Sequence, residues 1–270
     1  MYEIDGVPLS DRRGRWRLHR ETQRRAPVTM RAVDVTVPGV DGSLPIYGEA
    51  VEAAVLGLEL NVYGTPAEVE ARCAFLRGLL GKTHAPLLVQ RRDGAVAEAK
   101  PATISDPVMA AHYARISATL TIPAGVWRGP VTGWEADTLT GTHNIASLEG
   151  GSRPVTDPLV LITGPARNLT LTDDASGAVL RFTGDVPAGQ QLLVDVGAWR
   201  ATLGADVSWD SPGHDATASV DGTGPRSSTH LWTLTPRATP AGTTWTGVTV
   251  SATNTTAASG LRLRTRTSHL

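Results

Sequence analysis

The chain has 270 residues, enough for two domains of ordinary size, and 41% of them are hydrophobic, so each domain can bury a core. The 25 lysine and arginine residues nearly balance the 26 aspartate and glutamate residues. The net charge is therefore −1, and bulk electrostatics predict neither a nucleic-acid partner nor attraction to an acidic membrane. The single cysteine, Cys73, excludes an internal disulfide and a metal site built from several thiolates.

The distribution of apolar and turn-forming residues favours many short strands. No apolar run approaches the ~18 residues of a membrane-spanning helix, so we expect no membrane span. The first six residues lack the basic and apolar segments of a secretory signal, and we expect none. The 28 glycine and 18 proline residues are spread along the chain, which is typical of short strands joined by turns.

The first part of the chain alternates in the manner of β-strands. Residues 2–8 predict a short strand and a turn, and Trp16 and Leu18 alternate with polar residues. Residues 28–37 and 51–63 predict two further strands. Between the first of these strands and the apolar run 44–48 lies the turn signal of a hairpin, because proline fixes φ and glycine accepts positive φ. The turn residues are Pro38, Gly39, Asp41 and Gly42.

Residues 12–31 form an arginine-rich segment with eight arginines and one acid, Glu21. Arginine can neutralise nucleic-acid phosphates, or it can make several bonds at a protein interface while its stem packs. Because the rest of the chain is not basic, we favour an interface with an acidic partner surface. The arginines assigned to this interface are Arg12, Arg13, Arg15, Arg17, Arg20, Arg24 and Arg25.

The hydrophobic period changes after residue 64 and predicts one helix over residues 66–80. Thr65 is a suitable N-cap, Pro66 suits the first helical position, and Glu68 places an acid in the first turn. Apolar residues then recur at helical spacing until Gly81, which signals the end of the helix. Cys73 falls within this apolar set, so we expect its thiol to be buried and unreactive.

Strand patterns return after the helix. Residues 86–91 and 95–104 predict two strands around an Asp93-Gly94 turn, and residues 112–122 alternate over a long run. Residues 123–130, which include Trp127, are predicted to close the first domain. We place the boundary near residues 129–133, which gives domains of residues 1–130 and 131–270.

The second domain is predicted to be a β-sandwich. Its composition is rich in threonine and shows no helical period. Short strands at this spacing, with turns such as residues 174–177 between them, are typical of two packed antiparallel sheets. The predicted strands cover residues 142–146, 159–163, 169–173, 179–182, 191–196, 200–203, 230–235, 244–252 and 261–266.

No motif recommends a catalytic centre. The sequence lacks a phosphate-binding glycine loop, a dinucleotide fingerprint, a His-Glu-x-x-His zinc motif and a Gly-x-Ser-x-Gly nucleophile turn. The Asp173-Asp174 pair resembles half of a calcium loop but lacks the alternating ligands of an EF-hand, so we assign it to a hairpin turn. We assign His214-Asp215 to a solvated loop rather than a metal site. A glycan hydrolase would need a carboxylate pair that no segment nominates. We predict no enzymatic activity, no cofactor and no metal.

Tryptophans of the second domain allow two interpretations. An exposed indole can stack on a sugar ring, whereas a buried indole simply packs in a core, and we favour packing. The alternative function, a carbohydrate-binding module for host-surface adhesion, would use Trp199, Trp209 and Trp232 as glycan contacts.

The ordered series of motifs resembles the distal tail protein family of long-tailed bacteriophages. The turn Val37-Pro38-Gly39-Val40-Asp41-Gly42 is similar to a Pro-Gly-x-x-Gly turn of that family, and it precedes the single helix. Residues 118–123 with Trp127 are similar to its closing strand. In the second domain, residues 164–171 and 176–182 resemble the paired pattern G-x-A-x-N-P-x-L and G-x-x-L-x-F, although Leu169 replaces the usual proline, and residues 187–195 resemble x-A-G-x-x-L-x-I-D.

The resemblance implies a structural protein of the virion tail tip, assembled in the bacterial host cytoplasm. It implies an N-terminal β-sandwich or split-barrel domain with one helix, which forms a homohexameric ring, and a C-terminal galectin-like sandwich. The implied partners are the tail tube protein, the tape measure protein and the tail hub protein; the glycan alternative adds a host cell-wall glycan. No sequence-specific nucleic-acid binding is implied, although genome DNA would pass through the ring. A ring needs a heterologous interface that closes. We expect the arginine-rich segment and the turn at residues 37–42 to contribute to it, as a hairpin that adds to the neighbour's sheet.

Overall fold

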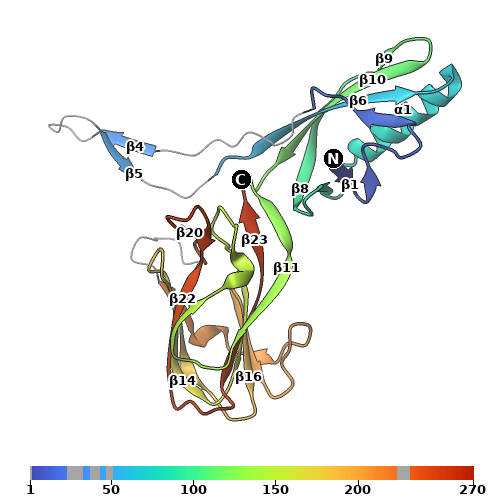
Figure 1. Ribbon diagram of the computed structural model, residues 1–270. Helices are drawn as coiled ribbons and strands as arrows, with labels where there is room; N and C mark the ends of the chain where they lie inside the picture. Colours follow the sequence, from blue (N-terminus) through green and yellow to red (C-terminus); the bar gives the residue numbers. More distant parts are fainter. Residues whose placement is uncertain (1, 23–32, 37–42, 47–50, 224–231) are drawn as a thin grey trace. The chain divides into compact units, whose positions relative to one another are not determined.

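The computed structural model describes residues 2–22, 33–36, 43–46, 51–223 and 232–270 (Figure 1). The chain divides into two compact units, Met1–Arg128 with Leu270, and Gly129–His269. Most described residues lie in antiparallel strands, and the described part contains one α-helix. The predicted mostly-β fold class with a single helix is therefore confirmed. Within the described residues, no helix has the length and apolar character needed to cross a bilayer.

The first unit is built from two antiparallel sheets that share strand β8. One sheet has the order β3-β6-β10-β8, with β9 paired to β10, and the other has the order β2-β1-β7-β8. The strands of this unit are β1 (Tyr2–Ile4), β2 (Val7–Pro8), β3 (Trp16–Leu18), β6 (Ala54–Tyr63), β7 (Leu87–Arg91), β8 (Val96–Ile104), β9 (Val108–Met109) and β10 (Tyr113–Ile122).

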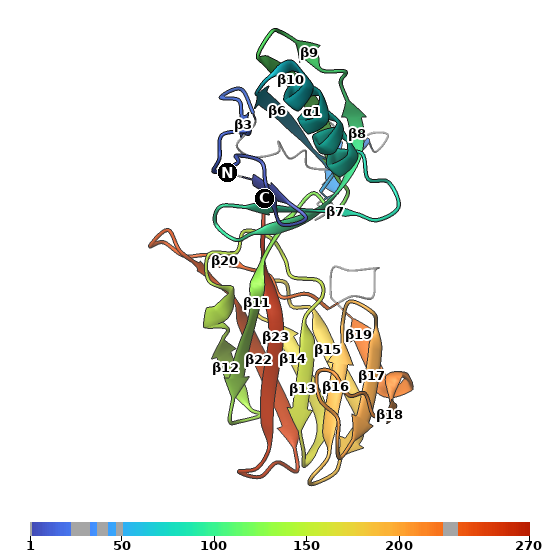
Figure 2. The ribbon, with the colours of Figure 1, turned by 90° about the vertical axis from the view of Figure 1, so that its right-hand side faces the viewer.

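The helix α1 (Pro66–Leu80) covers the apolar face of the first sheet, as Figure 2 shows beside β6 and β10. Strands β6 and β10 are paired over ten residues and alternate between buried and exposed side chains, so one face is apolar throughout. The apolar stripe of α1 packs on that face through Val69, Cys73, Leu76 and Leu80, which are all buried. The helix predicted over residues 66–80 and the buried position of Cys73 are confirmed.

Strands β4 (Val33–Thr36) and β5 (Ser43–Ile46) form a two-stranded antiparallel sheet of their own. Their register pairs Thr36 with Ser43, so the chain reverses direction between them, as predicted for residues 37–42. The turn residues themselves lie outside the described residues. Of the strand predicted over 28–37, the structure describes only residues 33–36.

Strand β11 (Trp127–Ala136) runs through the segment in which we placed a domain boundary. A ten-residue strand was not expected there, because the segment contains two glycines and a proline. The structure explains one of these residues: a Cβ atom on Gly129 would overlap Thr267 Oγ1, so glycine permits close approach to the neighbouring strand.

The second unit is a β-sandwich, as predicted. One sheet has the order β11-β23-β13-β16-β17-β18 and the other β12-β22-β14-β15-β19. Alternating side chains of both sheets enclose one apolar core. The remaining strands of this unit are β12 (Gly141–Asn144), β13 (Leu159–Thr163), β14 (Ala166–Asp173), β15 (Val179–Val186), β16 (Gln191–Asp195), β17 (Arg200–Gly204), β18 (His214–Asp215), β19 (Val220–Thr223), β20 (Arg237–Ala238), β21 (Thr244–Trp245), β22 (Gly247–Thr253) and β23 (Gly260–His269).

Two expectations for the second unit need correction. Residues 232–235, the described part of a predicted strand, contain only an isolated bridge between Leu234 and Val155. The strand predicted over residues 142–146 ends earlier, because β12 stops at Asn144. Ala146 instead begins the short 3₁₀ helix η1 (Ala146–Leu148). A second 3₁₀ helix, η2 (Thr217–Ser219), precedes β19. The hairpin turn predicted at Asp173-Asp174 is present.

The Asp173 carboxylate stabilises that turn from inside the core. It is fully buried and accepts hydrogen bonds from the backbone N–H of Ser176 at 3.0 Å and of Thr235 at 3.1 Å. A buried carboxylate that accepts backbone N–H bonds is compensated for its loss of water. Asp173 is therefore a structural acceptor that joins the β14–β15 turn to residues 232–235.

Candidate functional site

The arginine-rich segment begins with a tight turn that Asp11 organises. The Asp11 carboxylate accepts hydrogen bonds from Arg15 Nε at 2.8 Å, from Arg15 Nη2 at 3.1 Å and from the Arg15 backbone N–H at 3.2 Å. These bonds, the side-chain ones foremost, lower the pKa of Asp11 to about 2. Arg15 is thereby held in one orientation, whereas Arg12 and Arg13 are exposed at the turn.

Trp16 lies directly beneath this ion pair. The Arg15 guanidinium carbon is 4.6 Å from the centroid of the Trp16 ring, a cation–π contact. The Trp16 Nε1–H donates to the Pro8 carbonyl at 3.0 Å, so the indole is fixed from both sides. Trp16 is only 5% exposed and belongs to the core of the first unit. Arg15 and Trp16 therefore form a rigid surface element that continues into the core.

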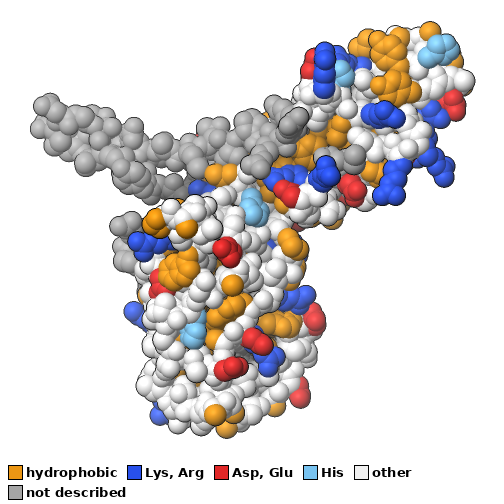
Figure 3. Space-filling view, viewed as in Figure 1, with side chains coloured by type: hydrophobic (Ala, Val, Ile, Leu, Met, Phe, Trp, Pro, Cys, Tyr) orange, Lys and Arg blue, Asp and Glu red, His pale blue; other side chains and the backbone are white. Residues whose placement is uncertain are grey.

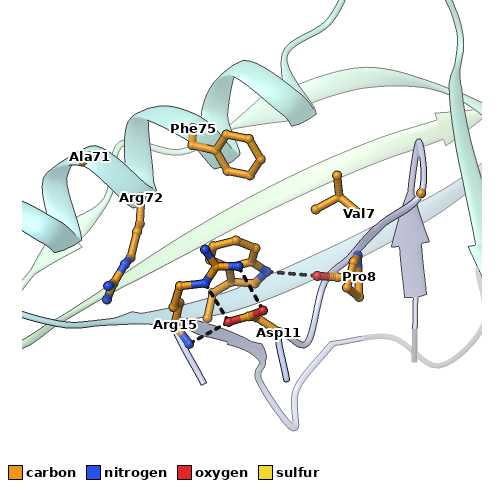
Figure 4. A pocket seen from close by; sticks show the side chains of 9 residues that line it. Val7, Pro8, Asp11, Arg15, Ala71, Arg72 and Phe75 are labelled. Atoms are coloured by element: carbon orange, nitrogen blue, oxygen red, sulfur yellow. Dashed lines mark hydrogen bonds and ion pairs between the residues drawn. The ribbon is translucent and has the colours of Figure 1, made fainter. Parts of the chain in front are cut away.

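A pocket of about 420 Å³ opens over Trp16 (Figure 4). Its walls come from the β1–β2 hairpin, from the Asp11–Trp16 segment and from the middle of α1. Phe75 projects from α1 toward it, 5.7 Å from the Trp16 ring centroid, and remains 49% exposed. An aromatic side chain that is half exposed beside a cavity is a feature of contact surfaces. The pocket residues are Gly6, Val7, Pro8, Asp11, Arg15, Trp16, Ala71, Arg72 and Phe75.

Arg72 forms the opposite rim of this pocket. Its guanidinium donates to Glu68 Oε1 at 2.8 Å, one helical turn earlier, and to the Tyr63 carbonyl oxygen. Glu68 Oε2 in turn accepts the Thr65 backbone N–H and hydroxyl, both at 2.9 Å. These Thr65 bonds, followed by the charge of Arg72, lower the pKa of Glu68. The first turn of α1 therefore positions Arg72.

A second network fixes the base of the chain segment that leads to β4 and β5. Thr22 bonds to the backbone of Glu59 on β6 through its hydroxyl, and the His19 backbone N–H donates to the Glu59 carbonyl at 2.7 Å. On the same sheet face, Arg115 donates to Glu21 at 3.2 Å and lies 3.7 Å from Glu59. The ion pairs are exposed and contribute little, so the backbone bonds define this anchor.

Exposed apolar side chains also gather at the hairpin of β9 and β10. Val108, Met109 and Tyr113 are 71%, 50% and 49% exposed, and Tyr113 pairs across the strands with Tyr63, which is 39% exposed. Figure 3 shows hydrophobic side chains beside lysine and arginine in the part of the first unit that carries β9 and α1. The described part of the first unit thus exposes apolar side chains at this hairpin and at the pocket, as well as singly at Val55 and Leu88.

The structure describes only some of the predicted interface residues. Arg12, Arg13, Arg17 and Arg20 are exposed on the described segment, and Arg15 is held by Asp11. The remaining predicted residues, Arg24, Arg25, Pro38, Gly39, Asp41 and Gly42, lie outside the described residues. Sequence reasoning missed the pocket, because its walls come from segments more than 50 residues apart. The available signal was Phe75, an aromatic residue outside the apolar stripe of a helix.

The proposed glycan contacts divide into two groups. Trp232 is 1% exposed in the core of the second unit, so its ring offers no face to a sugar, and the prediction for Trp232 is wrong. The sequence around Trp232 gave no signal of whether its side chain faces the core or the solvent. Trp199 packs on the same core while partly exposed, and Trp209 is also partly exposed; both stay predictions. Within the described residues, no three His, Cys, Asp or Glu side chains are grouped to hold a metal ion.

The architecture was compared with those of known proteins. No protein-family model matches the sequence, and no curated protein sequence does either. The structure matches the Dit protein (gp 19.1) of phage SPP1 with a TM-score of 0.65, at 13% identity, over 98% of this chain and 99% of that chain. The chain has the fold of SPP1 Dit. That protein is described as a paradigm of the hub adsorption apparatus in phages that infect Gram-positive bacteria.

Two structures of the phage P2 baseplate also match, both in the activated conformation. The calcium form gives a TM-score of 0.40 at 11% identity, with 98% of this chain and 97% of that chain covered. The strontium form gives 0.38 at 11% identity, with 97% of each chain covered. The likeness to SPP1 Dit covers both units, and it confirms at the level of the fold the resemblance found in the sequence motifs.

Proposed function

We propose that this chain is a structural protein of a bacteriophage tail tip that forms a homohexameric ring between the tail tube and the receptor-binding apparatus. The observation that carries the proposal is the full-length likeness to SPP1 Dit, a component of a hub adsorption apparatus, over both units. A fold shared at 13% identity does not transfer a function by itself, so the ring needs support from this chain's own surfaces.

The two-stranded sheet of β4 and β5 supplies that support. In the described part of the chain, these strands pair only with each other, and an isolated hairpin is at best marginally stable in water. Such a hairpin gains stability when it adds to the sheet of another molecule. A contact in which each copy inserts its hairpin into the next is heterologous, and it closes into a ring when the rotation between copies fits.

The anchor on β6 attaches the segment that leads to this hairpin. Thr22 and His19 join the outgoing chain to Glu59, and the returning chain re-enters the first unit at Val51 and Glu52, which pack beside Gly125. Both ends of the hairpin segment are thus attached to one unit. In this proposal the ring partners of each copy are its two neighbours, while the tail tube, tape measure and hub proteins bind the assembled ring in the virion.

Molecular mass in solution, followed by electron microscopy, tests the ring. We expect the wild-type protein to have the mass of a hexamer and to show six-fold rings with a central channel. A variant in which residues 24–49 are replaced by a short Gly-Ser linker should be a folded monomer. The deletion begins after Thr22, because Trp16 is a core residue whose removal would unfold the first unit.

The matched control shortens an exposed loop elsewhere. Replacing residues 254–258, which are exposed between β22 and β23, by a shorter linker should leave the mass of the oligomer and the rings unchanged. A wild-type monomer, or a hexamer that persists without residues 24–49, would contradict the proposed ring contact. Circular dichroism of each variant distinguishes a lost interface from a lost fold.

A further inference from the structure

The pocket over Trp16 is a preformed apolar socket. Its volume of about 420 Å³ lies within the ~300–1,000 Å³ range of sites that enclose a ligand or an anchor side chain. Trp16 and Phe75 both line the pocket, and the buried Trp16 forms its floor while the half-exposed Phe75 forms one wall, so an apolar group that enters would meet an aromatic surface. The hydrogen bond from Trp16 to Pro8 fixes the floor before anything binds.

The polar groups of the rim are also fixed in advance. Asp11 holds the Arg15 guanidinium with two side-chain hydrogen bonds, and Glu68 holds Arg72 on the other side. Side chains that are already ordered lose little conformational entropy when a partner binds. The socket therefore has the rigidity of a contact site rather than the mobility of an ordinary surface.

The segment that leads into this pocket carries an excess of positive charge. Residues 11–21 contain five arginines and two acids, although the whole chain has a net charge of −1. Both acids are engaged, Asp11 with Arg15 and Glu21 with Arg115. The other four arginines are exposed, and none has an ion-pair partner among the described residues. Carboxylates are the groups that exposed guanidinium groups bind best on a partner protein.

We infer that this pocket is the docking site for an acidic segment of another protein, which inserts one apolar side chain into the pocket against Trp16 and Phe75 and directs its carboxylates toward Arg12 and Arg13. The apolar interior accounts for the inserted side chain and the basic flank for the acidic neighbours. A peptide supplies both in a single segment. The inference goes beyond the ring and assigns Arg12 and Arg13 to this other protein, not to the ring contact expected from the sequence. It does not require the ring, because all the residues concerned belong to one unit of one copy.

Fluorine NMR of the full-length protein tests the inference at the site itself. The chain contains only two phenylalanines, Phe75 at the pocket and Phe182 in the core of the second unit, where it is 4% exposed. Incorporation of 4-fluorophenylalanine gives one signal for each, and a Phe75→Leu variant assigns them. The probe is an end-blocked heptapeptide, Glu-Asp-Glu-Leu-Glu-Asp-Glu. We expect it to shift the Phe75 signal saturably while the Phe182 signal stays in place.

Two comparison peptides separate the apolar and charged contributions. Replacing the leucine by serine should abolish the shift, and replacing the acids by lysine should abolish it as well. Raising sodium chloride to about 0.5 M should weaken binding by about tenfold, because exposed charge pairs are screened. Equal shifts with the lysine peptide would show a purely apolar pocket and overturn the inference.

Two pairs of variants give the matched controls. Ala71→Glu places a carboxylate in the pocket wall and should abolish binding, whereas Ala74→Glu adds the same charge at an exposed position of the same helix outside the pocket and should not. Arg12→Ala combined with Arg13→Ala should weaken binding at least about fivefold. Arg92→Ala removes an exposed arginine of the β7–β8 turn and should leave binding unchanged.

The remaining outcomes each contradict the inference. No shift of the Phe75 signal up to about 1 mM peptide would mean that the pocket does not bind such a segment. A larger response to an oligothymidine strand would identify a nucleic-acid surface. A Phe75 signal that depends on protein concentration without peptide would identify a second copy of the chain as the occupant. The mass of the oligomer tests the ring separately, so failure of one proposal leaves the other intact.

Discussion

The Thr22 hydroxyl makes two hydrogen bonds to the backbone of Glu59, accepting from its N–H at 3.0 Å and donating to its carbonyl at 2.9 Å. These bonds continue the pairing of β3 with β6 beyond Leu18, where the strand itself has ended. The Glu59 carbonyl also accepts the His19 backbone N–H, so the Thr22 side chain takes the place of a backbone partner for the Glu59 N–H. It lets the chain leave the sheet while this N–H stays satisfied.

Replacing this hydroxyl should loosen the base of the hairpin segment. Thr22→Val keeps the size of the side chain but leaves the Glu59 N–H without this partner, while the Glu59 C=O keeps the His19 N–H, so the change costs about 1–2 kcal/mol. We expect a lower melting temperature of the first unit, faster proteolysis after residue 22 and weaker ring assembly. Thr119→Val is the matched control, because Thr119 lies on the paired strand β10 and its side chain makes no hydrogen bond to another described residue. Equal effects of the two variants would show that the Thr22 hydrogen bonds to Glu59 do not anchor the hairpin segment.

The Asp11–Arg15 ion pair should make stability depend on pH in the acid range. The folded protein lowers the pKa of Asp11 to about 2, mainly through the Arg15 side-chain hydrogen bonds, so the ion pair stabilises the fold above about pH 4. This stabilisation is lost as the pH falls through about 2. Asp11→Asn should be less stable than the wild type at pH 7, and the difference should vanish near pH 2.

Urea unfolding at a series of pH values measures this difference. Asp206→Asn changes an exposed carboxylate of the second unit and should give curves parallel to those of the wild type. A difference between wild type and Asp11→Asn that stays constant from pH 7 to pH 2 would show that the carboxylate charge contributes nothing.

The parts of the fold that local signals determine were predictable from the sequence. The helix from Pro66 to Leu80 begins and ends where its capping residues place it, because caps and apolar spacing act within a few residues. Long alternating strands such as β10 were equally clear. Strand β11 was not predicted, since the need for Gly129 arises from Thr267, more than a hundred residues away.

The candidate site was harder to predict for the same reason. The arginine-rich segment was identified from composition, but composition does not show that Asp11 binds Arg15, or that the Arg15 guanidinium stacks on Trp16. Tryptophan counts likewise do not distinguish Trp232 in the core from a ring at the surface. Which way a side chain points, and which residue it contacts, depend on tertiary packing, which overrides the local sequence pattern.

Neighbouring positions of α1 should respond to truncation very differently. Leu76 is fully buried against the sheet, so Leu76→Ala should destabilise the first unit by about 2–5 kcal/mol through lost burial and a residual cavity. Phe75 is half exposed and packs against the Trp16 ring, so Phe75→Ala should cost about 1 kcal/mol. Thermal unfolding followed by circular dichroism measures both. A similar loss for both variants would mean that Phe75 belongs to the core rather than to a contact surface.

Gly125 is the position at which the returning end of the hairpin segment meets the first unit. Its φ of +65° lies in the left-handed region, and a Cβ atom there would overlap the Glu52 carbonyl oxygen and lie 2.8 Å from Val51 Cγ1. Gly125→Ala should therefore displace residues 51–52 as well as strain the turn, at a cost of 2 kcal/mol or more by order of magnitude.

Gly94 separates the two contributions to that cost. It has a φ of +85° at the β7–β8 turn, and a Cβ atom there would have no neighbour within 4 Å, so Gly94→Ala should cost only the backbone strain of about 1 kcal/mol. Measured by unfolding, Gly125→Ala should exceed Gly94→Ala, and measured by mass, only Gly125→Ala should weaken the ring. Equal stability losses with an unaffected ring would show that the returning chain does not depend on its contact with Gly125, because backbone strain alone would then account for both substitutions.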